Sequence, residues 1–304
     1  MALFIKNRKI YTEGVSLAAA SHCNLHCADC CAVSPYASAR FPSLSQVQMD
    51  LSILGEVLHA RELRLLGGEP LLNPEIGELA RLGKESGIAD LVTIFTNGRL
   101  LHKMDQLTWQ NLDQLMVSVY PEAPLSDSLL SEVADLAAKY NVQLRILRRH
   151  RFHTRVVNTP HPLDLTTRLI YRTCRPAHYD HCHRLHEGRL YQCYIPLALP
   201  DYLRRIGHEG YAPEQDGLAL YGQSDLFSAV KDHILSPEPL QACQYCLATL
   251  GKRRPHRQLT AEELRDPAGT EISRRTHLSP TRTALHLAGH IVHLAADRLR
   301  GGVS

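Results

Sequence analysis

Three cysteines, Cys23, Cys27 and Cys30, lie in one short stretch that directly follows the apolar run 15–20, which is typical of a buried strand. Three thiolates at this spacing can bind a 4Fe-4S cluster, and they leave one of its four irons without a protein ligand. Such an iron can bind a small chelating ligand, and the reduced cluster can pass that ligand an electron. A structural zinc site fits less well because it needs four ligands, and His26, the nearest fourth candidate, has poor reach inside the loop.

A second motif, Leu65-Leu66-Gly67-Gly68-Glu69-Pro70, follows a predicted strand. Together with the three cysteines it resembles the radical S-adenosylmethionine (SAM) enzymes. The resemblance implies that the open iron chelates the amino and carboxylate groups of SAM. Electron transfer then releases a 5'-deoxyadenosyl radical, which removes a hydrogen atom from the substrate. An ordinary turn would explain the glycines but not the Glu-Pro that follows them.

The resemblance also implies which residues bind SAM. Gly67 and Gly68 let the backbone approach the methionine moiety, and Glu69, before Pro70, accepts a hydrogen bond from its ammonium. Further candidates are Asn97, which can equally be a turn residue, and Ser118 and Arg145, which loosely match family positions that bind the SAM carboxylate. Ser118 and Arg145 could equally be structural side chains.

Composition sets the broad class of protein. The 304 residues, 44% of them hydrophobic, are enough for one large and one small globular domain. A net charge of +3 is too small to indicate a nucleic-acid partner, and no apolar run approaches membrane length. We therefore expect a cytoplasmic protein with no nucleic-acid or membrane partner. In that reducing compartment, nine cysteines favour clusters or catalysis over disulfides.

The first half of the chain alternates short apolar strands with amphipathic helices, which is typical of a parallel sheet covered by helices. A hairpin is expected over 3–11. Strands are expected at 15–19, 62–66, 91–95, 115–119 and 142–147, and helices at 45–59, at 127–140 and after Asn73-Pro74. Ligands gather at the C-terminal ends of such strands. The resemblance implies that this α/β architecture is a partial (β/α)6 barrel, which we assign to residues 1–160.

The regular alternation of predicted strands and helices stops after about residue 160. Residues 161–255 are assigned to a small α+β iron-sulfur domain, with a hairpin over 186–193 and a helix over 225–235 capped by Ser224. Residues 256–304 form a helical extension, in which a final helix starts at Ser279-Pro280. His286, His290 and His293 share a face of that helix, which we interpret as ordinary amphipathic surface.

Four cysteines in the second domain can close a ligand set around zinc or a cubane cluster, and spacing alone does not separate the two: Cys174, Cys193, Cys243 and Cys246. Their order resembles the twitch domain, a shortened SPASM domain with one auxiliary 4Fe-4S cluster. The expected cofactors are therefore SAM and two 4Fe-4S clusters. The two remaining cysteines, Cys31 and Cys182, are expected to be buried apolar residues, although Cys182 could also donate a hydrogen atom to a substrate radical or replace a ligand.

A cluster with four protein ligands can carry an electron but cannot chelate substrate, which favours redox chemistry. The resemblance is closest to aminocyclitol dehydrogenases, so we expect oxidation of an alcohol to a ketone on a small polar, sugar-derived or aminocyclitol substrate. A redox-neutral epimerase of an aminoglycoside or sugar, with Cys182 as hydrogen donor, is the near alternative. A peptide-modifying enzyme ranks third, because such relatives usually carry an extra N-terminal domain and 22 residues precede Cys23. A non-catalytic iron-sulfur or zinc protein is the alternative from a different class.

Two further groups of residues concern the binding of a protein partner and of the substrate. The basic run 252–257 is either a solvated segment or a docking site for a flavodoxin or ferredoxin reductant. A group of histidines and tyrosines could hydrogen-bond a polyhydroxylated substrate or form a hydrated loop: His178, Tyr179, His181, His183, His186 and Tyr191. The oligomeric state is left open.

Overall fold

The computed structural model describes residues 3–285. It begins with the expected hairpin, formed by β1 (Phe4–Lys6) and β2 (Lys9–Ala20). Asn7 and Arg8 make the turn with φ angles of 49° and 56°. Positive φ at both positions matches the twist of a two-residue hairpin turn.

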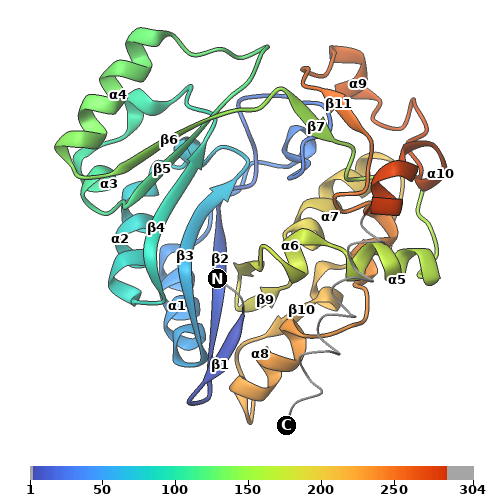
Figure 1. The fold of residues 1–304 in the computed structure, drawn as a ribbon, viewed down its shortest axis with the longest axis horizontal. Coiled ribbons are helices and arrows are strands. Elements are labelled where there is room, and N and C mark those ends of the chain that lie inside the picture. The colour runs from blue at the N-terminus through green and yellow to red at the C-terminus, as the bar shows by residue number, and fades with distance from the viewer. Residues whose placement is uncertain (1–2, 286–304) are drawn as a thin grey trace.

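Five parallel strands, linked by helices, follow one another in chain order across the sheet (Figure 1). The strands after β2 are β3 (Leu58–Gly67), β4 (Ala89–Thr96), β5 (Gln114–Val119) and β6 (Gln143–Arg148). The linking helices are α1 (Leu44–Val57), α2 (Ile76–Ser86), α3 (Gln106–Gln110) and α4 (Asp127–Lys139). Leu115, Val117 and Val119 of β5 are buried in the main core, whereas Met116 and Ser118 between them are half-buried. The sheet therefore has one apolar face and one more open face.

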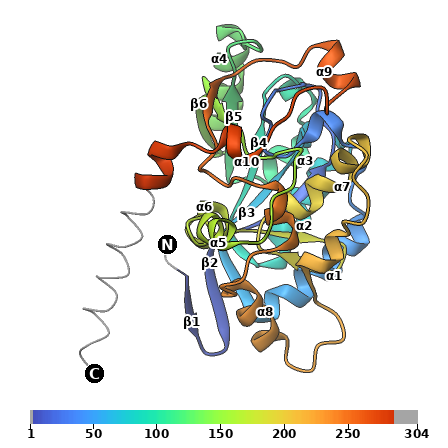
Figure 2. The ribbon, with the colours of Figure 1, turned by 90° about the vertical axis from the view of Figure 1, so that its right-hand side faces the viewer.

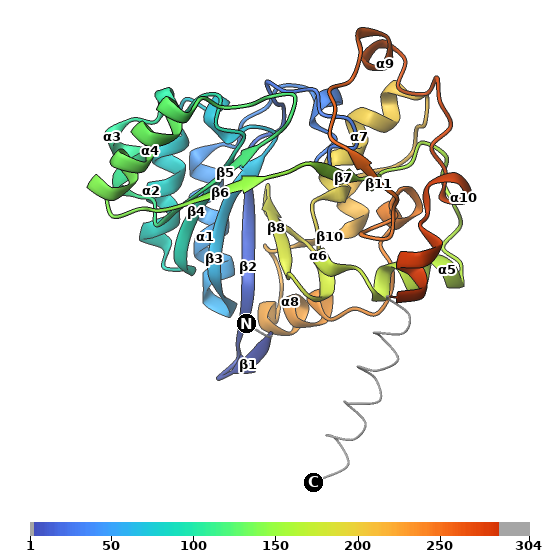
Figure 3. The same cartoon turned by 45° about the horizontal axis from the view of Figure 1, so that its top comes forward.

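A sixth parallel strand, β8 (Cys182–His186), comes from the second half of the chain and pairs with the opposite side of β2 (Figure 3). The order is β10-β9-β8-β2-β3-β4-β5-β6, with β1 also paired to β2, which makes nine strands in this sheet within residues 3–285. The antiparallel strands β9 (Arg189–Tyr191) and β10 (Gly217–Ala219) complete that edge. The α/β architecture is confirmed, and the sheet is open within residues 3–285. The domain boundaries stay a prediction, but the sheet crosses position 160.

The remaining elements lie to the right of β2 in Figure 1, on the side of β9 and β10, and this side faces the viewer in Figure 2. A two-stranded sheet is formed by β7 (Arg151–His153) and β11 (Arg253–Pro255). The helices of this half are α5 (Leu165–Arg172), α6 (Arg175–His178), α7 (Ile195–Arg205), α8 (Leu226–Ile234), α9 (Ala261–Arg265) and α10 (Arg274–His277).

Two details differ from the expectations. The N-cap of α8 is Asp225 and not Ser224, because the Asp225 carboxylate accepts the backbone N–H of Ser228. Most of the predicted final helix, with His286, His290 and His293, lies outside the described residues. No helix within residues 3–285 is both long and apolar enough to span a bilayer.

Candidate iron-sulfur and substrate site

The loop with the first three cysteines leaves the C-terminal end of β2. Cys27 is buried, and Cys23 and Cys30 are half-buried. Asn97, just after β4, places its Nδ2 3.6 Å from Cys23 Sγ, and Ser34 Oγ lies 3.3 Å from Cys30 Sγ. Burial raises the pKa of Cys23 and of Cys27 to about 12, so these thiols are neutral until a metal displaces their protons. Asn97 thus reaches the cysteine loop, as its position at a strand end predicted.

The Gly-Gly-Glu-Pro motif packs directly on the same loop. Gly68 donates its N–H to Ala20 O at 2.8 Å, and Glu69 donates its N–H to His22 O at 2.9 Å. A Cβ atom on Gly67 would lie 2.1 Å from Ala20 O, and one on Gly68 would lie 1.9 Å from His22 O. Both glycines are therefore required for contact between β3 and the cysteine loop, apart from the role toward SAM that the resemblance implies.

The carboxylate of Glu69 already has three donors within the protein. It accepts hydrogen bonds from Leu71 N, Thr96 Oγ1 and Asn97 N at 3.1, 2.6 and 2.8 Å. Burial raises the pKa of Glu69, whose side chain is 1% exposed. Pro70 is also buried and starts a short 3-10 turn. The structure shows that Glu69 joins the ends of β3 and β4, and its contact with the SAM ammonium stays a prediction.

Ser118 and Arg145 lie on the open face of the sheet. Arg145 of β6 pairs with Met116, and Ser118 pairs with Leu147, so all four share that face. Arg145 is exposed, and Ser118 hydrogen-bonds Tyr120, whose ring stacks on His256 with centroids 4.8 Å apart. Both residues therefore face the side on which a ligand would lie, while their roles toward SAM stay predictions.

A segment near the C-terminal end of the described chain covers the cysteine loop, which the sequence did not predict. We call residues 256–259 the covering segment. His256 Nε2 lies 3.2 Å from Cys27 Sγ. The backbone of the segment accepts Ala28 N–H at 2.9 Å and donates to His26 O at 2.7 Å.

The basic run that ends in this segment is largely engaged within the protein. Arg254 contacts His277 Nε2 at 2.7 Å, and Arg257 pairs with the carboxylate of Glu263. Docking of a flavodoxin or ferredoxin on this run stays a prediction, with less free positive charge than the sequence alone indicates.

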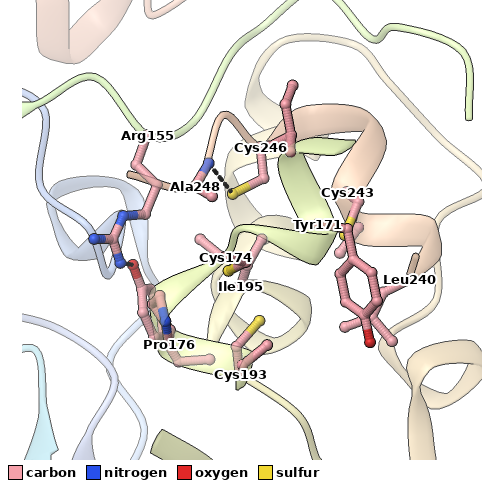
Figure 4. Close-up of a pocket in the computed structure, with 14 residues that line it drawn as sticks. Arg155, Tyr171, Cys174, Pro176, Cys193, Ile195, Leu240, Cys243, Cys246 and Ala248 are labelled. Atoms are coloured by element: carbon pink, nitrogen blue, oxygen red, sulfur yellow. Dashed lines mark hydrogen bonds between the residues drawn. The ribbon is translucent and has the colours of Figure 1, made fainter. Parts of the chain in front are cut away.

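The four cysteines predicted to hold the auxiliary cluster line one pocket of about 490 Å³ (Figure 4). Cys174 precedes α6, Cys193 precedes α7, and Cys243 and Cys246 lie in and after the 3-10 helix Gln241–Tyr245. Burial raises the pKa of Cys174 to about 12 and that of Cys193 well above its ordinary value. The presence of these four cysteines in one pocket fits the ligand set that the sequence predicts.

The donor set of this pocket is four thiols, which suits a cubane cluster or a zinc ion. Arg155 borders the same pocket, and its Nη1 donates to Tyr194 Oη at 2.7 Å. Its positive charge would offset the negative charge of four thiolates.

A larger pocket of about 960 Å³, which we call the strand-end pocket, lies at the C-terminal ends of β2 and β3. It is bordered by Ala32 after the first cysteine loop, by Gly67 of β3, and by Arg184 and His186 of β8. Tyr194 lines this pocket and the four-cysteine pocket alike. The two pockets are therefore neighbours, separated at Tyr194.

The two unassigned cysteines differ in their relation to the strand-end pocket. Cys182 begins β8 beside Gly14, and its Sγ lies 4.0 Å from Ser16 Oγ, well before the C-terminal end of β2. This location does not support the hydrogen-donor role, which stays untested. Cys31 is exposed, so the expectation of a buried residue is wrong for it. It influences the pKa of Arg184 and of Tyr194, both of which line the pocket.

Members of the predicted histidine and tyrosine group also differ in their relation to the strand-end pocket. His186 lines the strand-end pocket. His183 and Tyr191 are buried, and burial lowers the pKa of His183 to about 3, so its imidazole is neutral. A fully hydrated loop is therefore wrong for these two residues.

An open parallel sheet whose strand ends carry a three-cysteine loop and a Gly-Gly-Glu-Pro turn defines an α/β iron-sulfur protein. A family model described as a 4Fe-4S single cluster domain matches residues 13–142. The GTP 3',8-cyclase of Chlorobaculum tepidum is 37% identical over 107 residues, a match that spans 34% of this chain and 32% of the relative. The chain therefore spans about a third of the length of this relative.

Solved structures with some similarity include BtrN in complex with AdoMet and 2-DOIA, with 14% identity, a TM-score of 0.41, and coverage of 73% of this chain and 87% of BtrN. Streptococcus suis SuiB bound to S-adenosylmethionine has 11% identity, a TM-score of 0.38, and coverage of 72% and 65%. Native anSMEcpe with bound AdoMet and a peptide has 19% identity, a TM-score of 0.34, and coverage of 45% and 42%. At these TM-scores the similarities carry no argument about substrate.

Proposed function

We propose that this protein is a radical SAM enzyme, an oxidoreductase that converts an alcohol carbon of a small polar, sugar-derived or aminocyclitol substrate to a ketone. When bound, SAM and the reduced first cluster supply the hydrogen-abstracting radical. An auxiliary cluster held by the four second-domain cysteines would accept the remaining electron. The hydroxyl proton would leave to solvent or to a base, so the substrate loses two hydrogens overall.

The observation that carries this proposal is the position of the strand-end pocket. Its wall includes Ala32 next to the first cysteine loop and Tyr194, which also lines the four-cysteine pocket. A substrate in the strand-end pocket would therefore lie between the group that starts the reaction and the group that takes up the electron. Such an arrangement is needed for oxidation and is not needed for a redox-neutral reaction.

The test has two parts. Anaerobically reconstituted protein should contain roughly eight irons, as two clusters of four, and Cys174→Ala with Cys193→Ala should reduce this to about four. With dithionite, SAM and a panel of sugars, aminocyclitols and aminoglycosides, 5'-deoxyadenosine should form together with a product two mass units lighter. Iron content of about four in the wild-type protein, or product of unchanged mass, would contradict the oxidative reaction.

A redox-neutral epimerase is the second candidate, and the position of Cys31 favours it. Cys31 is exposed in the loop beside the strand-end pocket, whereas Cys182 lies deeper along β8. If the reaction is an epimerisation, Cys31→Ala should stop turnover and solvent deuterium uptake while SAM cleavage continues. The matched change Cys182→Ala should then have little effect. Loss of deuterium uptake in Cys182→Ala alone would instead restore Cys182 as the donor.

A further inference from the structure

Arg184 is a buried arginine without a partner. It lies in the middle of β8, its side chain is 3% exposed, and its Nε and Nη1 have no hydrogen-bond acceptor among residues 3–285. A guanidinium stays charged in a protein, and an unpaired buried charge costs several kcal/mol. A sequence retains such a group most readily when a ligand supplies the missing negative charge.

Arg64 on β3, which is half-buried, shows the ordinary arrangement, because its Nε donates to Glu62 Oε2 at 2.5 Å. The half-buried Arg155 donates from Nη1 to Tyr194 Oη at 2.7 Å, although its Nε also lacks an acceptor in the described part of the chain. The neighbours that favour the charged form of Arg184 are the thiols of Cys182, Cys31 and Cys193 and the phenol of Tyr194. None of these four groups is a carboxylate.

Arg184 lines the strand-end pocket. In β8, Arg184 shares a face with His186, which lines the same pocket, whereas the intervening Leu185 is buried in the main core. The register between β2 and β8 places Arg184 beside Ser16 of β2. Arg184 therefore lies on the open face of the sheet. Arg184 therefore borders a space large enough for a small molecule.

The pocket wall also carries two carboxylates. Asp201 accepts from Arg40 Nη2 at 2.8 Å and from Arg204 Nη1 at 3.1 Å, and the exposed Glu187 lies 3.7 Å from His186 Nε2. Neither carboxylate accepts a hydrogen bond from Arg184 Nε or Nη1.

We propose that Arg184 binds an oxyanion, a carboxylate or a phosphate group, carried by the substrate. The planar guanidinium binds either group through two parallel hydrogen bonds. This inference rests on the proposed function, and it narrows the sugar-derived class to acidic or phosphorylated members over basic aminocyclitols.

The test uses anions that need no knowledge of the substrate. Reconstituted, SAM-bound protein is titrated anaerobically with inorganic phosphate and, separately, with acetate, each against chloride at equal ionic strength. Heat of binding and Tm are measured. At least one oxyanion should bind and raise Tm, and Arg184→Met should weaken its binding about tenfold or more, the equivalent of one charge-assisted hydrogen bond. The two titrations distinguish a phosphate site from a carboxylate site.

Two further variants separate the site from general charge and from misfolding. Arg40→Gln removes an arginine of the same pocket that is paired with Asp201, so oxyanion binding should persist. Arg184→Lys keeps the charge but not the planar fork, and should give intermediate affinity if Arg184→Met does not fold.

Several results would overturn the proposal. The first is that neither oxyanion binds the wild-type protein or raises its Tm. The second is that Arg40→Gln and Arg184→Met lose oxyanion binding equally. The third is that Arg184→Met binds the oxyanion as the wild-type protein does. Loss of SAM binding or of the second set of irons in Arg184→Met, with oxyanion binding unchanged, would assign the guanidinium to a cofactor. Because binding is measured without turnover, the result is independent of whether the protein cleaves SAM or oxidises an alcohol.

Discussion

At the residue scale, close backbone contact explains the two glycines of the Gly-Gly-Glu-Pro motif. The loop carbonyls of Ala20 and His22 occupy the space that side chains at Gly67 and Gly68 would need. The sequence predicted glycines that allow close approach, and the structure shows the approach to be toward the cysteine loop. The identity of the partner could not be predicted, because a glycine pattern does not say which backbone lies opposite it.

Gly68→Ala should therefore destabilise the protein and displace the cysteine loop. The added Cβ would lie 1.9 Å from His22 O, so we expect a loss of about 2–3 kcal/mol in the free energy of unfolding, with lower iron retention. Denaturant unfolding and iron analysis measure both effects. Gly55→Ala within α1 is the matched control, because its new methyl group would meet only Ile88 Cγ1, at 4.0 Å. That control should be neutral or stabilising by up to about 1 kcal/mol.

His256 should tune the first cluster through its contact with Cys27 Sγ at 3.2 Å. A hydrogen bond donated to a ligand sulfur stabilises the more negative, reduced cluster and so raises its reduction potential. His256→Phe should keep the stacking on Tyr120 and lower the potential, as measured by a redox titration followed by electron paramagnetic resonance. Phe152→Leu alters the same aromatic group without touching the hydrogen bond and should leave the potential near its wild-type value. Equal potentials in the wild-type protein and His256→Phe would rule out this role.

At the scale of elements, one carboxylate joins the start of α5 to α10. Asp164 caps α5 by accepting Thr167 N–H at 2.9 Å, and both of its oxygens accept from Arg274 at 2.8 Å. The hydrogen bonds from Arg274 and Thr167 hold the pKa of Asp164 well below its usual value of 3.8. The residue thus stabilises a helix and a contact between distant segments at once.

Asp164→Asn should keep the cap and lose the ion pair. Because the Asp164 side chain is 37% exposed, the expected loss in unfolding free energy at neutral pH is at most about 1 kcal/mol. A lowered folded-state pKa contributes stability above the unfolded value, so the difference from wild type should shrink as pH falls below 3.8. Urea unfolding across pH measures this. Asp164→Ala removes the cap as well and should cost about 1 kcal/mol more; a pH-independent difference for Asp164→Asn would contradict the ion-pair account.

Local patterns predicted the parallel strands and most of the early helices, because each is defined by the periodicity of its own apolar residues. The convergence of Cys174, Cys193, Cys243 and Cys246 also followed from a motif. The pairing of β8 with β2 and the unpartnered state of Arg184 could not be predicted, because both depend on register between segments far apart in the chain.

At the scale of the whole molecule, the first cysteine loop is completed by the covering segment, residues 256–259. A chain that ends at Lys252 should lose the hydrogen bonds to His26, Cys27 and Ala28. We expect faster amide hydrogen exchange in residues 24–30 and weaker iron retention at the first cluster. A chain that ends at Leu259 keeps the segment and serves as the control. Slow exchange in both truncated chains would show that the loop is ordered without its cover.

The distance along the chain between Cys27 and His256, 229 positions, has a consequence for biosynthesis. A ribosome exposes the three-cysteine loop long before it has made the residues that cover it. During translation the loop is therefore open to solvent until residues 256–259 have been made. Delivery of iron and sulfide by an assembly protein would accordingly have its widest access to the nascent chain, and the completed fold would then close over the delivered cluster.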